Sequence, residues 1–283
     1  MDNKKRIAIQ SLSTLFHNAN LKGFFTGKIY QGKAKTFCVP GLNCYSCPGA
    51  TGACPIGSLQ SFLSEFKIKI PYYVVGFLIF FGCVFGRIIC GFLCPFGFIQ
   101  DLINKIPFPK KIKSFKGDKI LRKLKYVILI VFVIILPIFC KFTPAFCKYI
   151  CPAGTLSGLL LAFSDTKLFA MFSSNFMFKA CILGIILLLS VLIFRPFCKY
   201  LCPLGAFYSL FNKIAFVRMD KNSDKCSNCG ACSDICPMNV NPAADVNNLE
   251  CIRCGKCINA CPENALSYLY PLKKKDSEPE KNK

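Results

Sequence analysis

Two cysteine runs near the end of the chain carry the clearest chemistry. Each has the spacing C-x2-C-x2-C-x3-C followed by proline; the first contains Cys226, Cys229, Cys232 and Cys236, the second Cys251, Cys254, Cys257 and Cys261. This spacing places thiolates around cubane [4Fe–4S] clusters, and the fourth cysteine of each run ligates the other run's cluster. We therefore predict one cluster on Cys226, Cys229, Cys232 and Cys261 and a second on Cys251, Cys254, Cys257 and Cys236.

Zinc knuckles and a disulfide framework are the alternative interpretations of these runs. Zinc sites pair two C-x2-C units, or combine cysteine with histidine, across a longer gap. The chain has a single histidine, His17, far from both runs. Because two complete motifs agree, clusters are favoured. Their thiolates must stay reduced, so we expect this part to face a reducing compartment.

Composition predicts a membrane protein with a small soluble part. The chain has 283 residues, of which 53% are hydrophobic, a formal charge of +22 and 21 cysteines. Its mean hydropathy of +0.45 is high for a soluble protein. A large positive charge can indicate nucleic-acid binding. In a membrane protein the commoner cause is the enrichment of Lys and Arg in the loops that face the cytoplasm. We therefore expect no nucleic acid partner.

Three apolar segments, 70–86, 126–140 and 180–194, predict transmembrane helices. Residues 101–125 carry nine Lys or Arg and only two Asp, so the positive-inside rule places this loop in the cytoplasm. Residues 7–27 form either an amphipathic interfacial helix or a poor first span. Residues 155–172 are broken by Asp165 and Lys167, which predicts a re-entrant or interfacial helix.

A short repeat, Cys-Pro-x-Gly followed by apolar residues, begins at Cys54, Cys94, Cys151 and Cys202. In the last three copies another cysteine stands four positions earlier, at Cys90, Cys147 and Cys198. A lone C-x3-C pair is weak evidence for a cluster, because one helical turn often places two core cysteines on one face. Three copies, each at the end of a membrane helix, favour cluster ligation, since two pairs supply the four thiolates of a cubane.

Topology restricts which pairs can meet. The predicted spans place Cys90, Cys94, Cys198 and Cys202 on the inner side, where they can hold one cluster. Cys147 and Cys151 fall on the outer side, together with Cys38, Cys44, Cys47 and Cys54 if residues 7–27 span. These six cysteines are more than the four that one cluster needs, so the ligand set stays open. If residues 155–172 also span the membrane, this assignment of cysteine pairs to the inner and outer sides no longer holds. A structural or disulfide loop is the alternative for Cys38–Cys54.

With these motifs, the chain resembles the membrane-bound 4Fe-4S polyferredoxins, which include the H-type membrane subunit of periplasmic nitrate reductase systems and the membrane core of the nitrous-oxide reductase accessory protein. The resemblance covers most of residues 70–265 and rests on Gly86-Arg87 before Cys90 and Cys94, on Arg195-Pro-Phe before Cys198 and Cys202, and on the two C-terminal runs. It implies electron transfer at the cytoplasmic membrane, linked to quinol and a partner reductase. The Cys38–Cys54 loop and the Cys147 and Cys151 pair indicate a subgroup with additional cluster sites.

We predict an α-helical multi-pass membrane domain with a C-terminal α+β two-cluster bacterial ferredoxin domain. The expected parts are a basic N-terminal segment with a Cys-rich loop (1–70), the transmembrane domain (71–215), the ferredoxin domain facing the cytoplasm (216–270) and a disordered charged tail (271–283).

The predicted function is electron transfer through [4Fe–4S] clusters between a cytoplasmic donor or the quinol pool and a partner redox protein. The chain has no haem motif, Gly-rich nucleotide loop or acid–base pair, so we expect an electron-transfer subunit of the inner membrane rather than a stand-alone enzyme. The alternatives are a maturation or redox-regulatory accessory protein for a metalloenzyme, a true quinol dehydrogenase subunit and, least favoured, a zinc scaffold.

Overall fold

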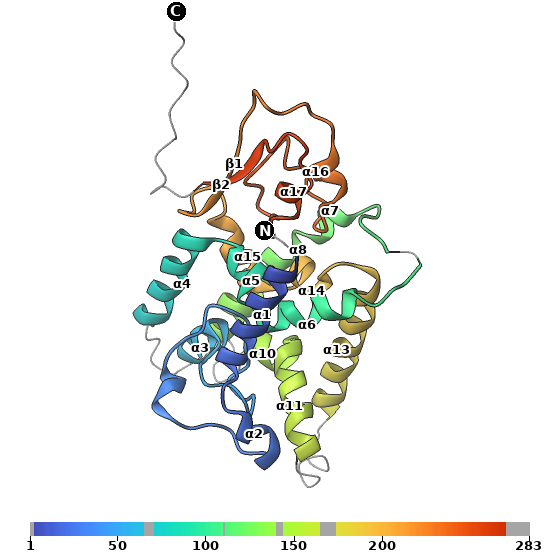
Figure 1. Cartoon of the computed structure of the whole chain (residues 1–283). Helices are drawn as coiled ribbons and strands as arrows, with labels where there is room; N and C mark the ends of the chain where they lie inside the picture. Colours follow the sequence, from blue (N-terminus) through green and yellow to red (C-terminus); the bar gives the residue numbers. More distant parts are fainter. Residues whose placement is uncertain (1–2, 65–70, 110, 140–143, 165–173, 270–283) are drawn as a thin grey trace, which may run out of the picture.

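Helices make up most of the computed structural model, with one small sheet at one end (Figure 1). The structure describes residues 3–64, 71–109, 111–139, 144–164 and 174–269. The predicted tail, 271–283, lies outside these residues. The helix-rich part of the predicted fold class is confirmed.

The Cys-Pro-x-Gly repeats are helix starts. They open α3 (Pro55–Leu63), α6 (Pro95–Asn104), α11 (Pro152–Ser164) and α15 (Pro203–Leu210). Proline suits the first helical position because its missing N–H needs no partner there and its φ is already helical. In α6 and α15 the N-cap thiols of Cys94 and Cys202 accept the N–H of the repeat's glycine.

One-turn helices carry the first cysteine of each C-x3-C pair. They are α5 (Ile88–Phe92), α10 (Ala145–Tyr149) and α14 (Pro196–Tyr200). Each ends just before a repeat, so the chain turns between the two cysteines of the pair. That turn brings both thiols to the start of the helix that follows.

Longer apolar helices correspond to the three predicted spans. The first is α4 (Tyr72–Phe85), and the third is α13 (Ser174–Leu192). The second is a continuous run of α8 (Leu124–Ile128), the π-helical η2 (Leu129–Ile135) and α9 (Leu136–Phe139). Among the described residues only one helix, over Asn175–Leu192, is long and apolar enough to cross a membrane, with a mean hydropathy of 2.2.

The N-terminal segment forms two helices rather than one long one. These are α1 (Asn3–His17) and α2 (Leu21–Thr26), and η1 (Lys33–Thr36) follows them. The α1 helix packs on α5 and α6, and the loop after η1 is closed by an isolated parallel bridge between Cys38 and Ala53. A short helix, α7 (Asp118–Leu121), lies in the basic loop before α8.

The C-terminal head, residues 216–269, holds the sheet. Strands β1 (Arg218–Lys221) and β2 (Leu266–Leu269) are antiparallel, with Arg218 opposite Leu269. Between them lie α16 (Ala231–Asp234) and α17 (Lys256–Asn259). Gly230 and Gly255 precede these two helices with positive φ, a conformation that glycine adopts without strain.

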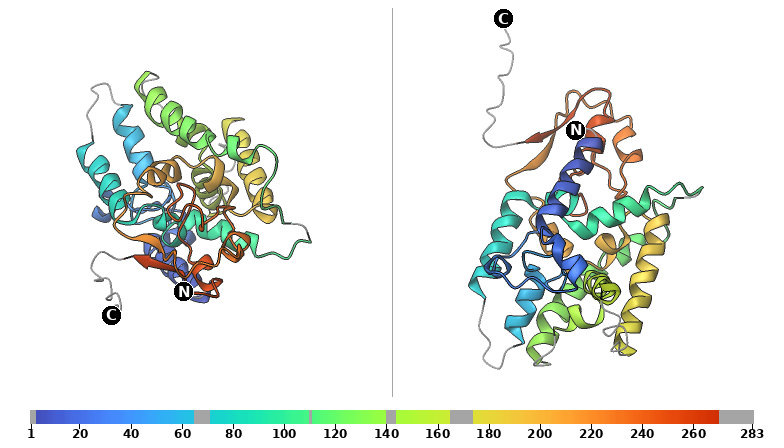
Figure 2. Two further views of the ribbon diagram at one scale, coloured as in Figure 1. Left: turned by 90° about the horizontal axis from the view of Figure 1, so that it is seen from above. Right: turned by 60° about the horizontal axis from the view of Figure 1, so that its bottom comes forward.

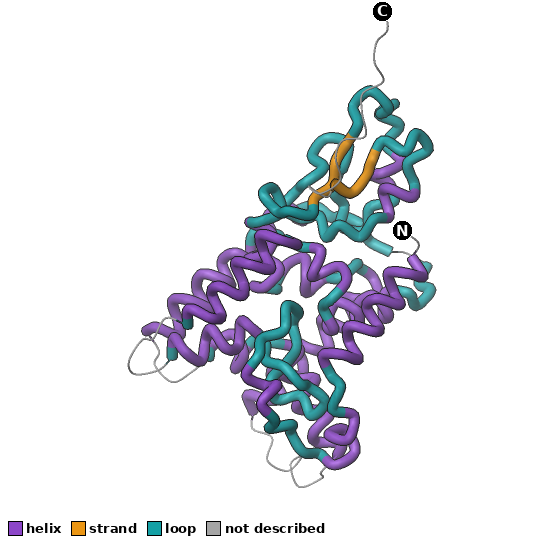
Figure 3. Tube along the Cα trace, turned by 60° about the vertical axis from the view of Figure 1, so that its left-hand side comes forward, coloured by secondary structure: helices purple, strands orange, loops and turns teal. Residues whose placement is uncertain are grey.

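The head sits at one end of the helical body (Figure 3). The N-terminus of α1 lies beside it, and α11 and α13, which pack together, reach the opposite end (Figures 1 and 2). One core cluster of buried residues runs from the Cys38–Cys54 loop through the helical body to Met238 and Ile252 of the head. The head is therefore packed onto the body rather than tethered to it.

Candidate iron–sulfur centres

The head contains two cavities, each lined by four cysteines. One is lined by Cys226, Cys229, Cys232 and Cys261, and the other by Cys236, Cys251, Cys254 and Cys257. These are the two sets predicted from the crossed pairing of the runs. Backbone N–H groups point at the sulfurs, from Ala265 to Cys261 at 3.3 Å and from Arg253 to Cys251 at 3.4 Å. We call them head site one and head site two.

Four further cysteines gather where α5, α6, α14 and α15 meet, and we call them the inner site: Cys90, Cys94, Cys198 and Cys202. Burial raises the pKa of the Cys198 thiol to about 12; Arg195 opposes this shift, whereas Cys94 and Cys90 add to it. The Gly97 N–H lies 3.4 Å from the Cys94 sulfur, and the Gly205 N–H lies 3.3 Å from the Cys202 sulfur. The structure thus brings together the four cysteines predicted to share one cluster.

A second set in the helical body, the outer site, joins two cysteines of the N-terminal loop to one C-x3-C pair: Cys44, Cys54, Cys147 and Cys151. A methyl group built on Gly57 would lie 3.8 Å from the Cys147 sulfur and 3.9 Å from Cβ of Cys54, and one built on Gly154 would lie 3.8 Å from the Cys44 sulfur. Burial raises the pKa of Cys54 to about 12, and the neighbouring Cys151 and Cys44 add to this shift.

Cys38 and Cys47 lie near the outer site but bond elsewhere. The Cys38 thiol faces the Ser58 hydroxyl at 3.9 Å, and the Cys47 thiol faces the Asn18 carbonyl oxygen at 3.6 Å. The predicted six-cysteine group therefore divides into four that face one another and two at its edge. Sequence spacing alone did not separate them.

The residues present fit [4Fe–4S] clusters. All twenty cysteines in the described part of the chain are free thiols, so none of them forms a disulfide. Burial raises the pKa of several of the grouped thiols, among them Cys54, Cys94 and Cys198. Such thiols need a nearby cationic group before they can ionise, and cluster iron supplies one. Across those described residues, no three Cys, His, Asp or Glu side chains are spaced to hold a single metal ion, whereas cubane ligands each bind a different iron.

Helix geometry supports negative charge at these sites. Cys54, Cys94 and Cys202 occupy the N-caps of α3, α6 and α15. The N-terminus of a helix carries a partial positive charge from its unpaired N–H groups. Thiolates at the inner and outer sites are therefore stabilised by helix ends as well as by individual N–H donors.

Two buried arginines flank the inner site. Arg195 is fully buried and binds Asp101 through two contacts of 2.6 Å, and it also donates to the carbonyl oxygen of Cys90. Arg87, equally buried, donates to the carbonyl oxygen of Cys198 at 3.3 Å. Each arginine stands three positions before the first cysteine of a C-x3-C pair. In the sequence both arginines are parts of the family pattern, and the cysteine spacing gives neither of them a role.

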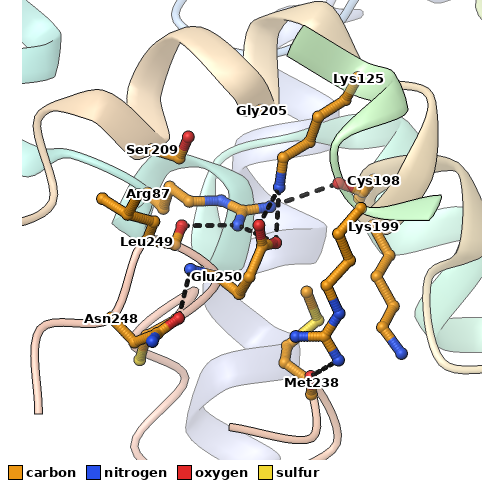
Figure 4. Close-up of polar contacts among 12 residues, drawn as sticks. Arg87, Lys125, Cys198, Lys199, Gly205, Ser209, Met238, Asn248, Leu249 and Glu250 are labelled. Carbon is orange, nitrogen blue, oxygen red and sulfur yellow. Dashed lines mark hydrogen bonds and ion pairs between the residues drawn. The ribbon is translucent and has the colours of Figure 1, made fainter. Parts of the chain in front are cut away.

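Arg87 also joins the inner site to the head. Its guanidinium donates to the Leu249 carbonyl and to the Glu250 carboxylate, both at 2.9 Å. Lys125, fully buried, contacts both carboxylate oxygens of Glu250 at 2.5 Å. Figure 4 shows Glu250 held between the two cations. Burial alone would raise the pKa of Glu250, but Arg87 and Lys125 lower it below its usual value, so the carboxylate is ionised.

Comparison with known proteins identifies the family. The sequence pattern of the 4Fe-4S binding domain matches residues 52–73, 72–116, 124–168 and 177–221, which is more than half of the chain. The chain belongs to the 4Fe-4S binding domain family. A 4Fe-4S dicluster domain also matches residues 218–262, which include every cysteine of the head.

Several curated proteins are similar to this family member. An uncharacterised protein of Methanocaldococcus jannaschii is 29% identical over 225 residues, covering 78% of this chain and 88% of the relative. The methylamine utilization ferredoxin-type protein MauN of Paracoccus denitrificans is 28% identical, covering 63% of this chain and 59% of the relative. The ferredoxin-type protein NapH of Haemophilus influenzae is 25% identical, covering 56% and 50%. No solved structure matches the chain.

The chain is therefore an iron–sulfur electron-transfer protein with several [4Fe–4S] clusters, and the predicted resemblance to polyferredoxins is confirmed. It spans only about half to three fifths of the length of the two ferredoxin-type relatives. Which cysteine ligates which cluster stays a prediction.

Proposed function

We propose that the chain is a membrane-bound electron carrier that passes single electrons between a cytoplasmic donor or the quinol pool and a partner redox protein. Its sixteen cysteines in four groups would hold four clusters in the order head site one, head site two, inner site, outer site. A cluster bound at each site would take up and release one electron at a time. The chain's own part is to fix the spacing of the sites and their local charge.

Contact between the segments that carry the sites is the observation behind this proposal. A methyl group built on Gly91, beside Cys90 of the inner site, would lie 2.6 Å from the carbonyl oxygen of Ile252, beside Cys251 of head site two. On the other side of the inner site, a methyl group built on Gly41, the residue before Leu42, would lie 3.0 Å from Cα of Cys94. Leu42 stands two residues before Cys44 of the outer site. Contacting backbone segments therefore connect head site two to the inner site and the inner site to the outer site.

The helical body has an apolar core and also exposes many large apolar side chains, and this exposed surface supports a membrane location. In α1 the buried side chains are Arg6, Gln10 and His17, whereas Leu12 is 70% exposed and Phe16 77% exposed. Large apolar side chains are also exposed along α4, η2 and α13. Exposed apolar surface of this extent marks a membrane or protein interface.

We infer a multi-pass arrangement from the same surfaces. The proposed spans are α4, the α8–η2–α9 run and α13, with the basic loop before α8 and the head on the cytoplasmic side. At 1.5 Å per residue the 14 residues of α4 reach about 21 Å, less than the roughly 30 Å of hydrocarbon. Thinning of the bilayer accommodates such short spans. The proposal includes the division of the chain into an N-terminal segment (1–70), a transmembrane domain (71–215), a ferredoxin domain (216–270) and a charged tail (271–283).

A quinol-linked role is favoured by a cavity against the outer site. It is lined by apolar side chains, among them Leu42, Phe96 and Leu156, together with Asn18 and the ligand candidate Cys44. Small-molecule sites are mostly apolar with a few polar groups that fix orientation. The direct check is reduction of the purified protein by a quinol: no cluster reduction would leave the soluble donor as the electron source.

Iron and acid-labile sulfide content of the anaerobically purified full chain tests the four-site arrangement. We expect about sixteen irons, four for each site. Replacing the cysteine pair Cys198 and Cys202 by serine should remove about four irons, and so should replacing the pair Cys147 and Cys151. About eight irons in the wild-type chain, unchanged in both variants, would overturn the proposal, because only the head would then be loaded.

A further inference from the structure

One position recurs in the Cys-Pro-x-Gly repeats without an explanation so far. The sixth residue after the repeat's cysteine is buried and carries a hydrogen-bonding group in all four copies: Gln60, Gln100, Ser157 and Tyr208. Apolar residues would satisfy the packing of these helices at lower cost, because a buried polar group must find a hydrogen-bond partner. The four copies therefore share a hydrogen-bonding side chain at this depth.

At the inner site the structure shows what this side chain does. The Gln100 carbonyl oxygen accepts the backbone N–H of Phe197 at 3.2 Å. Its amide nitrogen lies 3.2 Å from the sulfur of Cys198. Gln100 thus uses one end to hold the segment that carries a ligand candidate and the other end to donate to that ligand's sulfur.

Gln60 repeats the first half of this arrangement at the outer site. Its side chain is fully buried, and its carbonyl oxygen lies 3.5 Å from the backbone nitrogen of Cys147. That contact requires the oxygen to face Cys147, which fixes the orientation of the amide. The Gln60 amide nitrogen is buried and has no hydrogen-bond partner among the described residues.

An unpaired buried donor of this kind is costly, because it has lost its hydrogen bonds to water and gained none in the protein. The amide nitrogen shares its carbon with the oxygen that binds Cys147, so it lies at the edge of the outer site. A sulfur-rich, negatively charged group held there would provide the missing acceptor. This observation is independent of the cysteine spacing that defines the site.

We propose that Gln60 is a positioning residue whose amide N–H is the hydrogen-bond donor for the [4Fe–4S] group of the outer site, as the Gln100 amide is for the inner site. This inference rests on the proposed function, because it requires a cluster at the outer site. A hydrogen bond to sulfur stabilises the extra negative charge of the reduced state, so it raises the reduction potential. Gln60 therefore sets how readily the outer site holds an electron.

The test is a redox titration of the anaerobically purified full chain followed by electron paramagnetic resonance. The outer-site signal is first identified as the one lost when Cys147 and Cys151 are replaced by serine. Gln60→Met removes the donor at nearly constant shape. Gln60→Glu keeps the acceptor for the Cys147 N–H but replaces the donor with a carboxylate oxygen. Gln31→Met is the matched control, because Gln31 is exposed in the same N-terminal part.

In Gln60→Met we expect about tenfold less reduced outer site at a fixed ambient potential, which is 59 mV for a one-electron couple. Gln60→Glu should shift the potential further in the same direction, and Gln31→Met should not shift it. The other sites should titrate as in the wild type.

An unchanged outer-site potential in Gln60→Met and Gln60→Glu would overturn the inference. Loss of four irons in both variants would overturn it too, because Gln60 would then hold the Cys147 segment in place rather than donate to the group bound there. If the two serine substitutions remove neither iron nor a signal, the proposed function itself fails at the outer site, and that result is distinct from an unshifted potential.

Discussion

Replacing Glu250 by glutamine tests how the head is held on the helical body. The Glu250 carboxylate contacts Arg87 at 2.9 Å and Lys125 at 2.5 Å, and both cations have fully buried side chains. Gln has nearly the same size but no charge, so E250Q leaves the permanently charged Arg87 buried without its counter-charge. Breaking a buried ion pair by removing one partner costs about 3–5 kcal/mol.

Hydrogen exchange of the full, cluster-loaded protein measures this loss where it occurs. We expect the segment 247–253 of the head to open more often, and a cost of about 3 kcal/mol corresponds to roughly a hundredfold faster amide exchange. Asp224→Asn is the control, because Asp224 is an exposed acid of the same head. It should leave exchange in this segment unchanged.

A second variant separates charge from contact. Lys125→Met leaves Arg87 and Glu250 as a balanced pair, so it should accelerate exchange less than E250Q does. Equal exchange in E250Q and Asp224→Asn would refute the reasoning. So would a Lys125→Met effect as large as that of E250Q, because the charge balance would then not matter.

Two further predictions concern packing and ligand choice. Gly91→Ala should loosen the head by about 1–3 kcal/mol, since the added methyl lies 2.6 Å from the Ile252 carbonyl oxygen; faster proteolytic release of the head would show this, and Gly184→Ala, with open space around it, should behave as wild type. Cys38→Ser should keep the full iron content whereas Cys44→Ser should lose about four irons, and equal iron in the two variants would contradict the division of the N-terminal loop.

Local spacing predicted most of the candidate cysteine sites. The head runs and the C-x3-C-P pairs are short motifs whose geometry follows from one turn of chain, and the structure groups the head and inner-site cysteines as expected. The N-terminal loop has no such local rule. Its cysteines are sorted by tertiary contacts, such as the bridge between Cys38 and Ala53 that leaves the Cys38 thiol facing Ser58.

Buried charge was harder to predict. Glu250 precedes a ligand candidate of the head and Lys125 ends a basic loop, so both look like surface residues in the sequence. Their burial depends on docking of the head onto helices more than a hundred residues away. The sequence does carry one signal, the arginine three positions before Cys90 and before Cys198, because an arginine next to a buried cysteine pair needs an acid as its counter-charge.

The two arginines of the inner site exchange partners. Arg87, which precedes Cys90, donates to the carbonyl oxygen of Cys198, and Arg195, which precedes Cys198, donates to that of Cys90. Each C-x3-C unit is therefore held by the arginine of the other. The geometry of the inner site is therefore stabilised by contacts between segments separated by about one hundred residues.

The counter-charges of these arginines come from different places, and that difference ties the head to the inner site. Asp101, seven residues after the cysteine of its repeat, neutralises Arg195. The same position of the last repeat is Ser209, which carries no charge. Arg87 instead obtains its carboxylate from Glu250 of the head. Since a buried guanidinium without a counter-charge is costly, docking of the head stabilises the inner site through Arg87.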